Sequence, residues 1–239
     1  MFTVALIGPD GAGKTAISRR IVESSPLRVK YLYMGVNVDS SNRMLPTTRL
    51  VAALRRTSGK KVEWKGPPVP EQTKSAPKGI RKRVLGGLRA SLRLVNRLGE
   101  EWYRQSLTWF YLWQGNIVLY DRHFFFDYYA YDIAPLQENR PLSRRIHGFI
   151  LQHIFPKTDF VIYLDAPAEV LFSRKGEGTI EDLERRRQEY LQAGEQVQHF
   201  AIVDATQSIE QVTNEVATLI WNFHEARKKK QTKRFKQTL

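Results

Sequence analysis

The chain has 239 residues, 42% of them hydrophobic, which is enough for one large globular domain or two small ones. It contains no cysteine, which excludes disulfides and thiolate zinc sites, and no apolar run as long as a membrane span. The formal net charge is +14, and the short apolar start at Phe2–Ile7 lacks the basic segment of a signal peptide, so we expect a cytoplasmic protein.

Five largely apolar runs that alternate with helical patterns predict the strands of one parallel sheet, and the first of them is apolar on both faces, as a buried parallel strand requires. They cover residues 2–7, 27–34, 116–121, 159–165 and 199–205. Helices are expected at about 14–23, within 43–56, at 80–113, within 124–133 and 143–154, from 167 to 192 with a break at 176–178, and at 209–223, and residues 57–79 read as a loop. This alternation predicts a doubly wound α/β domain, with its ligand site at the carboxyl ends of the strands.

The positive charge is concentrated in two stretches. Residues 55–97 hold 13 basic residues against two acidic ones, and residues 226–239 hold seven basic residues and no acid. We therefore expect one domain at residues 1–225 with a basic insertion at about 55–97, followed by a basic, disordered tail at 226–239. A solvated surface, a contact with an anionic membrane or glycan, and a contact with nucleic acid are the alternatives for both stretches.

The stretch GPDGAGKT, here called the glycine loop (Gly8–Gly13) with Lys14 and Thr15, fits the phosphate-binding pattern G-x-x-x-x-G-K-[ST] between a strand and a helix. Glycines let successive backbone N–H groups point at phosphate oxygens, at the positive end of the helix. Lys14, which we expect to be exposed, would reach the terminal phosphates of ATP, and the Thr15 hydroxyl would hold Mg²⁺. The predicted nucleotide-binding residues are Gly8, Asp10, Gly11, Ala12, Gly13, Lys14, Thr15 and Ala16.

Asp10–Thr15 (DGAGKT) and four later segments resemble the thymidylate kinase family, in the order in which that family has them. The later segments are YDRH at 120–123, YLDAPAEVLFSR at 163–174, RRRQEYL at 185–191 and IVDATQSIEQV at 202–212. The resemblance covers the first twenty-odd residues and most of 116–223. It implies a P-loop NTPase-type, five-stranded parallel sheet with a helical lid.

The same resemblance implies roles for single residues. Asp121 would position Mg²⁺ or the acceptor phosphate, Arg122 would hold the acceptor's phosphate, and Asp10 would touch a sugar hydroxyl of the acceptor. Because the glycine loop has no arginine, the lid would supply the charge that stabilises the transition state. The remaining residues implied by the resemblance are Arg174, Arg185 and Arg187 of the lid, and Ala205 and Thr206 beside the adenine. Lys14, Asp121, Arg122 and Arg174 would thus be the catalytic residues, and Thr15 and Asp121 the metal ligands.

The acceptor side departs from the family. The Thr-Arg-Glu-Pro-Gly-Gly segment expected after the second strand is absent from residues 31–50, and Phe126 and Asp127 stand where the family has paired serines. Tyr128, Tyr131 and Asp132 are the best candidates for an acceptor pocket, whereas most of the aromatic residues at 102–113 and 124–131 are expected in the core.

We therefore expect an ATP- and Mg²⁺-dependent kinase. The family's default reaction is nucleoside monophosphate plus ATP to nucleoside diphosphate plus ADP, with dTMP as the acceptor, although the altered acceptor side predicts poor use of dTMP. Alternatives are transfer to a sugar or glycan, and an ATP-binding switch or scaffold without transfer. The expected partners are ATP, a small-molecule or glycan acceptor, an anionic membrane or other polyanion at the basic stretches, and a second copy of the chain in a homodimer.

Overall fold

The structure is a computed structural model that describes residues 1–36, 45, 48, 80–134 and 140–237. Most of the expected helix at 43–56, the loop at 57–79, and with them most of the basic insertion, lie outside the described residues.

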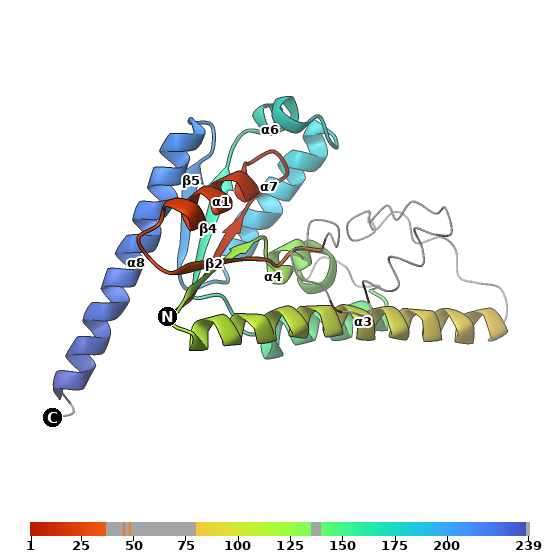
Figure 1. Cartoon of the computed structure of the whole chain (residues 1–239). Coiled ribbons are helices and arrows are strands. Elements are labelled where there is room, and N and C mark those ends of the chain that lie inside the picture. The colour runs from red at the N-terminus through yellow and green to blue at the C-terminus, as the bar shows by residue number, and fades with distance from the viewer. Residues whose placement is uncertain (37–44, 46–47, 49–79, 135–139, 238–239) are drawn as a thin grey trace.

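The described chain forms an α/β structure around a five-stranded, all-parallel sheet (Figure 1). The strands are β1 (Thr3–Ile7), β2 (Val29–Tyr33), β3 (Ile117–Asp121), β4 (Phe160–Asp165) and β5 (Phe200–Asp204), in the order β2-β3-β1-β4-β5. The five predicted strands are confirmed. In this order β1 is central, and the chain leaves it first toward one edge and later toward the other, which is where α/β sheets form a ligand crevice.

Helices cover both faces of the sheet, as its wholly buried strands β1 and β3 require. Helices α1 (Lys14–Ser24) and α8 (Ile209–Gln237) pack on one face through Ile17, Ile21, Val216 and Ile220. The other face is covered by α3 (Ile80–Trp113), α4 (Phe124–Asp127), α5 (Leu142–Phe149) and two short π-helical turns, η2 (Tyr129–Ile133) and η3 (Ile150–Ile154).

The helical segment after β4 is divided in two, as the sequence predicts. Helix α6 (Ala168–Lys175) ends at Gly176 and α7 (Ile180–Gly194) begins after Thr179. Gly176 and Gly178 have φ values of 65° and 80°, a conformation that favours glycine, and the Thr179 side chain accepts a hydrogen bond from the N–H of Asp182.

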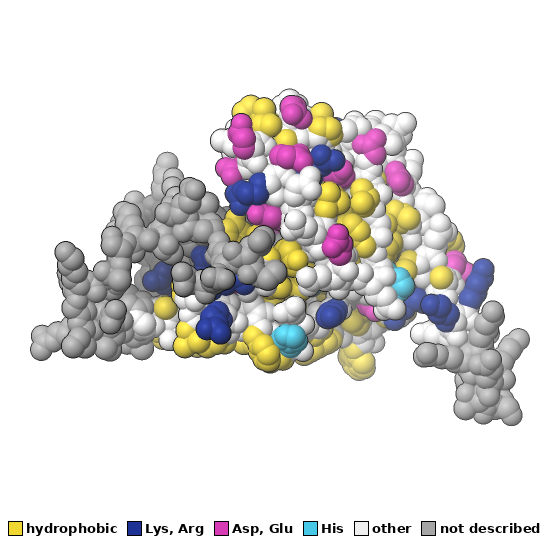
Figure 2. Space-filling model, turned by 180° about the vertical axis from the view of Figure 1, so that it is seen from behind, with side chains coloured by type: hydrophobic (Ala, Val, Ile, Leu, Met, Phe, Trp, Pro, Cys, Tyr) yellow, Lys and Arg dark blue, Asp and Glu magenta, His cyan; other side chains and the backbone are white. Residues whose placement is uncertain are grey.

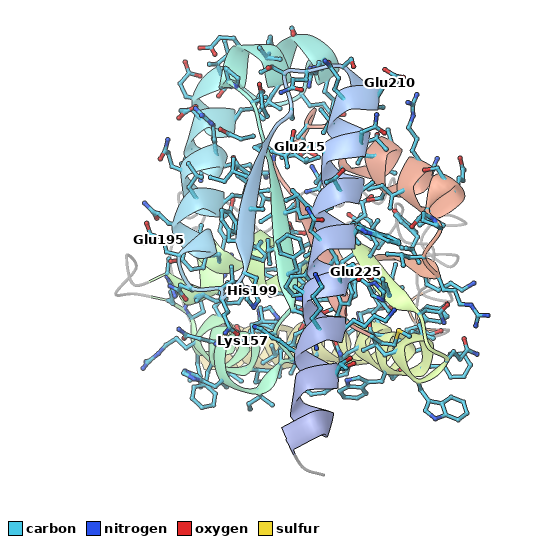
Figure 3. The ribbon with its side chains drawn as sticks, turned by 90° about the vertical axis from the view of Figure 1, so that its left-hand side faces the viewer. Lys157, Glu195, His199, Glu210, Glu215 and Glu225 are labelled. Carbon is cyan, nitrogen blue, oxygen red and sulfur yellow. The ribbon has the colours of Figure 1, made fainter. Side chains whose placement is uncertain are left out.

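The basic tail differs from the expectation, because α8 continues to Gln237 where we expected a disordered segment. The sequence contains no glycine or proline after Gly194, and the tail is rich in lysine, arginine and glutamine, which favour helix. Figure 3 shows Glu210, Glu215 and Glu225 along α8 and the helix continuing past Glu225. Among the described residues, no helix is both long and apolar enough to cross a membrane.

Candidate functional site

A cavity of about 580 Å³ opens at the carboxyl edge of the sheet, between the glycine loop, the end of β3, and α6 and α7. This volume is typical of sites that hold a small molecule. The predicted site residues that line it are Asp10, Gly11, Gly13, Lys14, Thr15, Ala16, Arg122, Tyr131 and Arg174. The structure therefore brings the start of the chain, the end of β3 and the region after β4 to one place.

Two glycines let the glycine loop pass close to neighbouring backbone. A Cβ atom at Gly8 would lie 2.6 Å from the carbonyl oxygen of Leu164, and one at Gly11 would lie 2.6 Å from that of Leu171. Gly13 has a φ of 84° and directly precedes the first turn of α1. The loop thus presents the N-terminus of α1 to the cavity, which favours an anionic ligand there.

Lys14 is buried rather than exposed, with only 5% of its surface accessible. Its Nζ donates hydrogen bonds to the carbonyl oxygens of Gly8, at 2.8 Å, and Pro9, at 2.6 Å. Burial, together with repulsion from Arg122, lowers the pKa of Lys14 to about 7. A phosphate within reach of Lys14 would favour its charged form and so bind it more tightly.

Thr15 and Asp121 form the candidate magnesium site. The Thr15 hydroxyl donates to Oδ2 of Asp121 at 2.5 Å, and the Tyr31 hydroxyl donates to the same oxygen at 2.9 Å. Oδ1 of Asp121 is buried and has no hydrogen-bond partner among the described residues. One hydroxyl and one carboxylate with a free oxygen fit Mg²⁺, which is usually held by few protein groups together with substrate phosphates and water.

Arg122 lies between two carboxylates at the end of β3. Its guanidinium donates to Oδ1 of Asp10, and its other terminal nitrogen lies 3.9 Å from Oδ1 of Asp127. Burial would lower the pKa of Arg122, but Asp127 and Asp10 hold it well above its ordinary value. Arg122 also has a φ of 69°, the only positive φ among the described non-glycine residues. Such strain costs about 1–3 kcal/mol and is concentrated at functional sites.

Asp10 and Asp127 line the same cavity in different electrostatic settings. Asp10 also faces Arg186, at 3.4 Å, and Lys175, at 3.5 Å, and these cations with Arg122 and Lys14 outweigh the effect of burial and lower its pKa. Asp127 accepts two long hydrogen bonds of 3.3 Å, from the N–H of Val36 and the hydroxyl of Tyr190. Burial raises the pKa of Asp127, and the nearby cations offset only part of that effect.

The predicted lid arginines have different environments. Arg174 lines the cavity and donates to the carbonyl oxygens of Ala205, at 2.6 Å, and Thr206, at 3.4 Å, so these three predicted residues do meet. Arg187 forms a two-pronged ion pair with Asp165, at 2.6 and 2.8 Å. Arg185 pairs with Asp182 and Glu189 on its own helix. Neither Arg185 nor Arg187 lines the cavity; Arg186, between them, does.

Two of the three acceptor-pocket candidates lie away from the cavity. Asp132 accepts from Nδ1 of His147 at 2.6 Å in a buried cluster with Glu101, and the Tyr128 ring packs on His147. Only Tyr131 faces the cavity.

Sequence reasoning missed Arg186 and did not assign a role to Asp127. Arg186 lies three residues after Leu183 and four before Tyr190, both of which are buried, so helical spacing alone could have favoured it over Arg185. For Asp127 the signal was its place after the Asp-Arg pair, where the expected serine is missing. No family model matches the chain.

Proposed function

We propose that the protein is an ATP- and Mg²⁺-dependent phosphotransferase of the thymidylate-kinase-like group. The observation that carries the proposal is the 2.5 Å contact between Thr15, at the start of α1, and Asp121, at the end of β3, beside a cavity lined by Lys14. P-loop NTPases hold Mg²⁺ with a hydroxyl at the start of this helix and a strand-end aspartate.

The remaining side chains suit phosphoryl transfer, which depends on positioning and charge neutralisation more than on covalent chemistry. Lys14 would bind the terminal phosphates, and Arg174 and Arg186 would meet the charge that develops on the transferred group. When bound, Mg²⁺ would neutralise the β- and γ-phosphate oxygens. Arg122 and Asp10 would face the acceptor, and the strain at Arg122 supports a functional role for that residue.

The test is ADP release from ATP and Mg²⁺ against two sets of acceptors, nucleoside monophosphates including dTMP, and neutral sugars. The control is Thr15→Val, which keeps the shape of the side chain but removes its hydroxyl. We expect acceptor-dependent ADP release by the wild type and very little by Thr15→Val. ATP binding with no ADP release for any acceptor would show a nucleotide-binding switch instead. A specificity constant of roughly 10⁵ M⁻¹s⁻¹ or more for dTMP would establish a thymidylate kinase.

A further inference from the structure

Carboxylates line the part of the cavity around Arg122, where an acceptor that already carries a phosphate would place that phosphate. We propose that the acceptor is a neutral polyhydroxylated molecule such as a sugar or glycan, and that Asp127 accepts the proton of the hydroxyl that is phosphorylated. This inference rests on the proposed phosphotransferase function and specifies its substrate class.

Two carboxylates surround Arg122. A guanidinium can bind a phosphate in two-pronged fashion, but here Asp10 contacts one terminal nitrogen and Asp127 lies 3.9 Å from the other. A monophosphate dianion at Arg122 would therefore approach two carboxylates, and like charges at close range oppose each other in a buried site. A hydroxyl group meets no such repulsion, and carboxylates are good acceptors for its hydrogen bond.

The two carboxylates differ in how well they can accept a proton. Asp10 is held by three cationic side chains, Arg122, Arg186 and Lys175, which favour its charged form and make it a weak proton acceptor. Among the described residues, Asp127 has one ion-pair contact, with Arg122 at 3.9 Å, and two hydrogen bonds of 3.3 Å, while Lys14 and Arg186 act on it from a greater distance; its side chain is 8% exposed. Burial raises its pKa, which brings it closer to the range that favours a general base at neutral pH.

Aromatic side chains form the cavity wall beside Asp127. Phe126, Tyr131 and Tyr190 line the cavity beside Asp127 and are nearly buried. Aromatic rings offer large apolar faces, and tyrosine adds a polar hydroxyl. This combination suits a ring whose carbon faces are apolar and whose edge carries hydroxyls.

The reaction step balances without a further reactant. The acceptor oxygen forms a bond to the γ-phosphorus of ATP, and the bond from that phosphorus to the β–γ bridging oxygen breaks. The bridging oxygen keeps the electron pair and leaves with ADP, and the proton of the acceptor hydroxyl passes to a carboxylate oxygen of Asp127.

The experiment measures ADP release by the full chain with glycerol, glucose, galactose and N-acetylglucosamine as neutral probes, and dTMP, UMP and AMP as charged ones. We expect at least one neutral probe, and no monophosphate, to stimulate ADP release. Stimulation by any monophosphate, or by no neutral probe, would overturn the inference. The first of these outcomes would leave the proposed phosphotransferase function intact, which separates the two failures.

The role of Asp127 is then tested with the active neutral probe. Asp127→Asn should lower kcat by roughly 10²–10⁴-fold, the usual contribution of a general base, while ATP affinity measured by titration stays the same. Tyr190→Phe keeps the ring but removes a hydrogen bond to the charged form of Asp127. It should shift the ascending limb of the kcat–pH profile to higher pH. An unshifted limb in Tyr190→Phe, or an unchanged kcat in Asp127→Asn, would overturn the assignment of Asp127 as the base.

Discussion

The carboxyl edge of the sheet and the face formed by α3 and α5 use their side chains in opposite ways. At the edge, charged groups such as Lys14, Asp121 and Arg122 are largely buried and held by polar partners. On the α3–α5 face, large apolar side chains are exposed: Leu92, Val95, Trp109, Phe110, Trp113, Leu142, Ile146 and Phe149. Figure 2 shows hydrophobic side chains along this lower edge of the molecule.

The carboxyl edge and the α3–α5 face also differ in how their charged residues are distributed. Acidic residues on the described part of α3 are limited to Glu100 and Glu101, which are buried, and residues 140–157 contain no acid. The carboxyl edge of the sheet, in contrast, resembles a preorganised polar site, in which each group has a fixed position before a ligand arrives. We therefore expect substitutions at the carboxyl edge to change catalysis and ATP binding, and substitutions at or beneath the α3–α5 face to change stability.

The largest effect is expected for Lys14→Ala at the edge. It should reduce kcat/KM by more than any other single change, because Lys14 would contribute both to ATP binding and to the charge of the transition state. ATP titration and thermal melting would be compared with the wild type. The melting temperature should change little, because the buried ammonium is costly to desolvate and its loss offsets that of two hydrogen bonds. Equal ATP affinity in the two proteins would contradict the assignment of the glycine loop.

Arg174→Ala should come next, with a loss in kcat on the order of 10³-fold and a much smaller change in ATP affinity. The reason is that charge placed around the transferred group acts mainly in the transition state. Steady-state kinetics with the active acceptor would measure it. The matched control is Arg20→Ala, which removes an exposed arginine that pairs with Glu210 on α8. If both variants keep the wild-type kcat, Arg174 has no part in the chemistry.

Beneath the α3–α5 face, His147→Ala should lower the free energy of unfolding by about 3–5 kcal/mol, because it removes the hydrogen-bond partner of the buried Glu101 and the shortest contact of Asp132, which Arg97 and Arg144 face at longer range. Burial would lower the pKa of His147, but hydrogen bonds to Asp132 and Glu101 raise it in the folded state. The stabilisation by charged His147 is thus fully present below about pH 6.5 and is lost as pH rises through the raised folded-state pKa.

Urea unfolding of wild type and His147→Ala at pH 6 and pH 9 measures this effect, with His153→Ala as the control. His153 is exposed on the same segment, so its loss should cost no more than about 0.5 kcal/mol. A difference between wild type and His147→Ala that grows as pH rises would contradict the prediction.

The smallest effect is expected from deleting the tail from Lys228 onward. Arg227, which pairs with Asp159 at 2.6 Å, remains, and the removed segment is nearly devoid of apolar residues. The melting temperature should shift by no more than about 2 °C, and ATP binding should be unaltered. A loss of many degrees would show that the tail packs against the domain.

The fold was predictable because its signals are local and repeated. Most of the strands are nearly continuous apolar runs, Gly176 ends α6, and the predicted helix at 80–113 is confirmed as α3. The extent of α8 was not predictable, because low apolar content alone does not distinguish a disordered tail from an exposed helix. The burial of the aromatic side chains was also predictable only in part. Those at 124–131 are largely buried as expected, but Trp109, Phe110 and Trp113 are 48%, 47% and 84% exposed.

The candidate site was predictable where the chain itself positions the residue. Lys14 and Thr15 follow the glycine loop, and Asp121 ends a strand that lies beside β1, with Leu6 opposite Asp121. Helical spacing indicates that Arg186 lies on the buried side of α7, but its contact with Asp10, and the two electrostatic settings of Asp10 and Asp127, depend on side chains from three elements. Such tertiary contacts are not encoded in any local pattern.

The central position of β1 has a consequence for how the chain folds. Thr3 lies opposite Val118 and Val4 opposite Phe160, so within the described sheet β1 pairs only with strands that are synthesised much later. Parallel pairings over such long separations close slowly, and an apolar strand without its neighbours is prone to aggregate. During synthesis, β1 and the glycine loop must therefore stay unpaired until β3 and β4 emerge, which makes the nascent chain a natural client for chaperones that shield apolar segments.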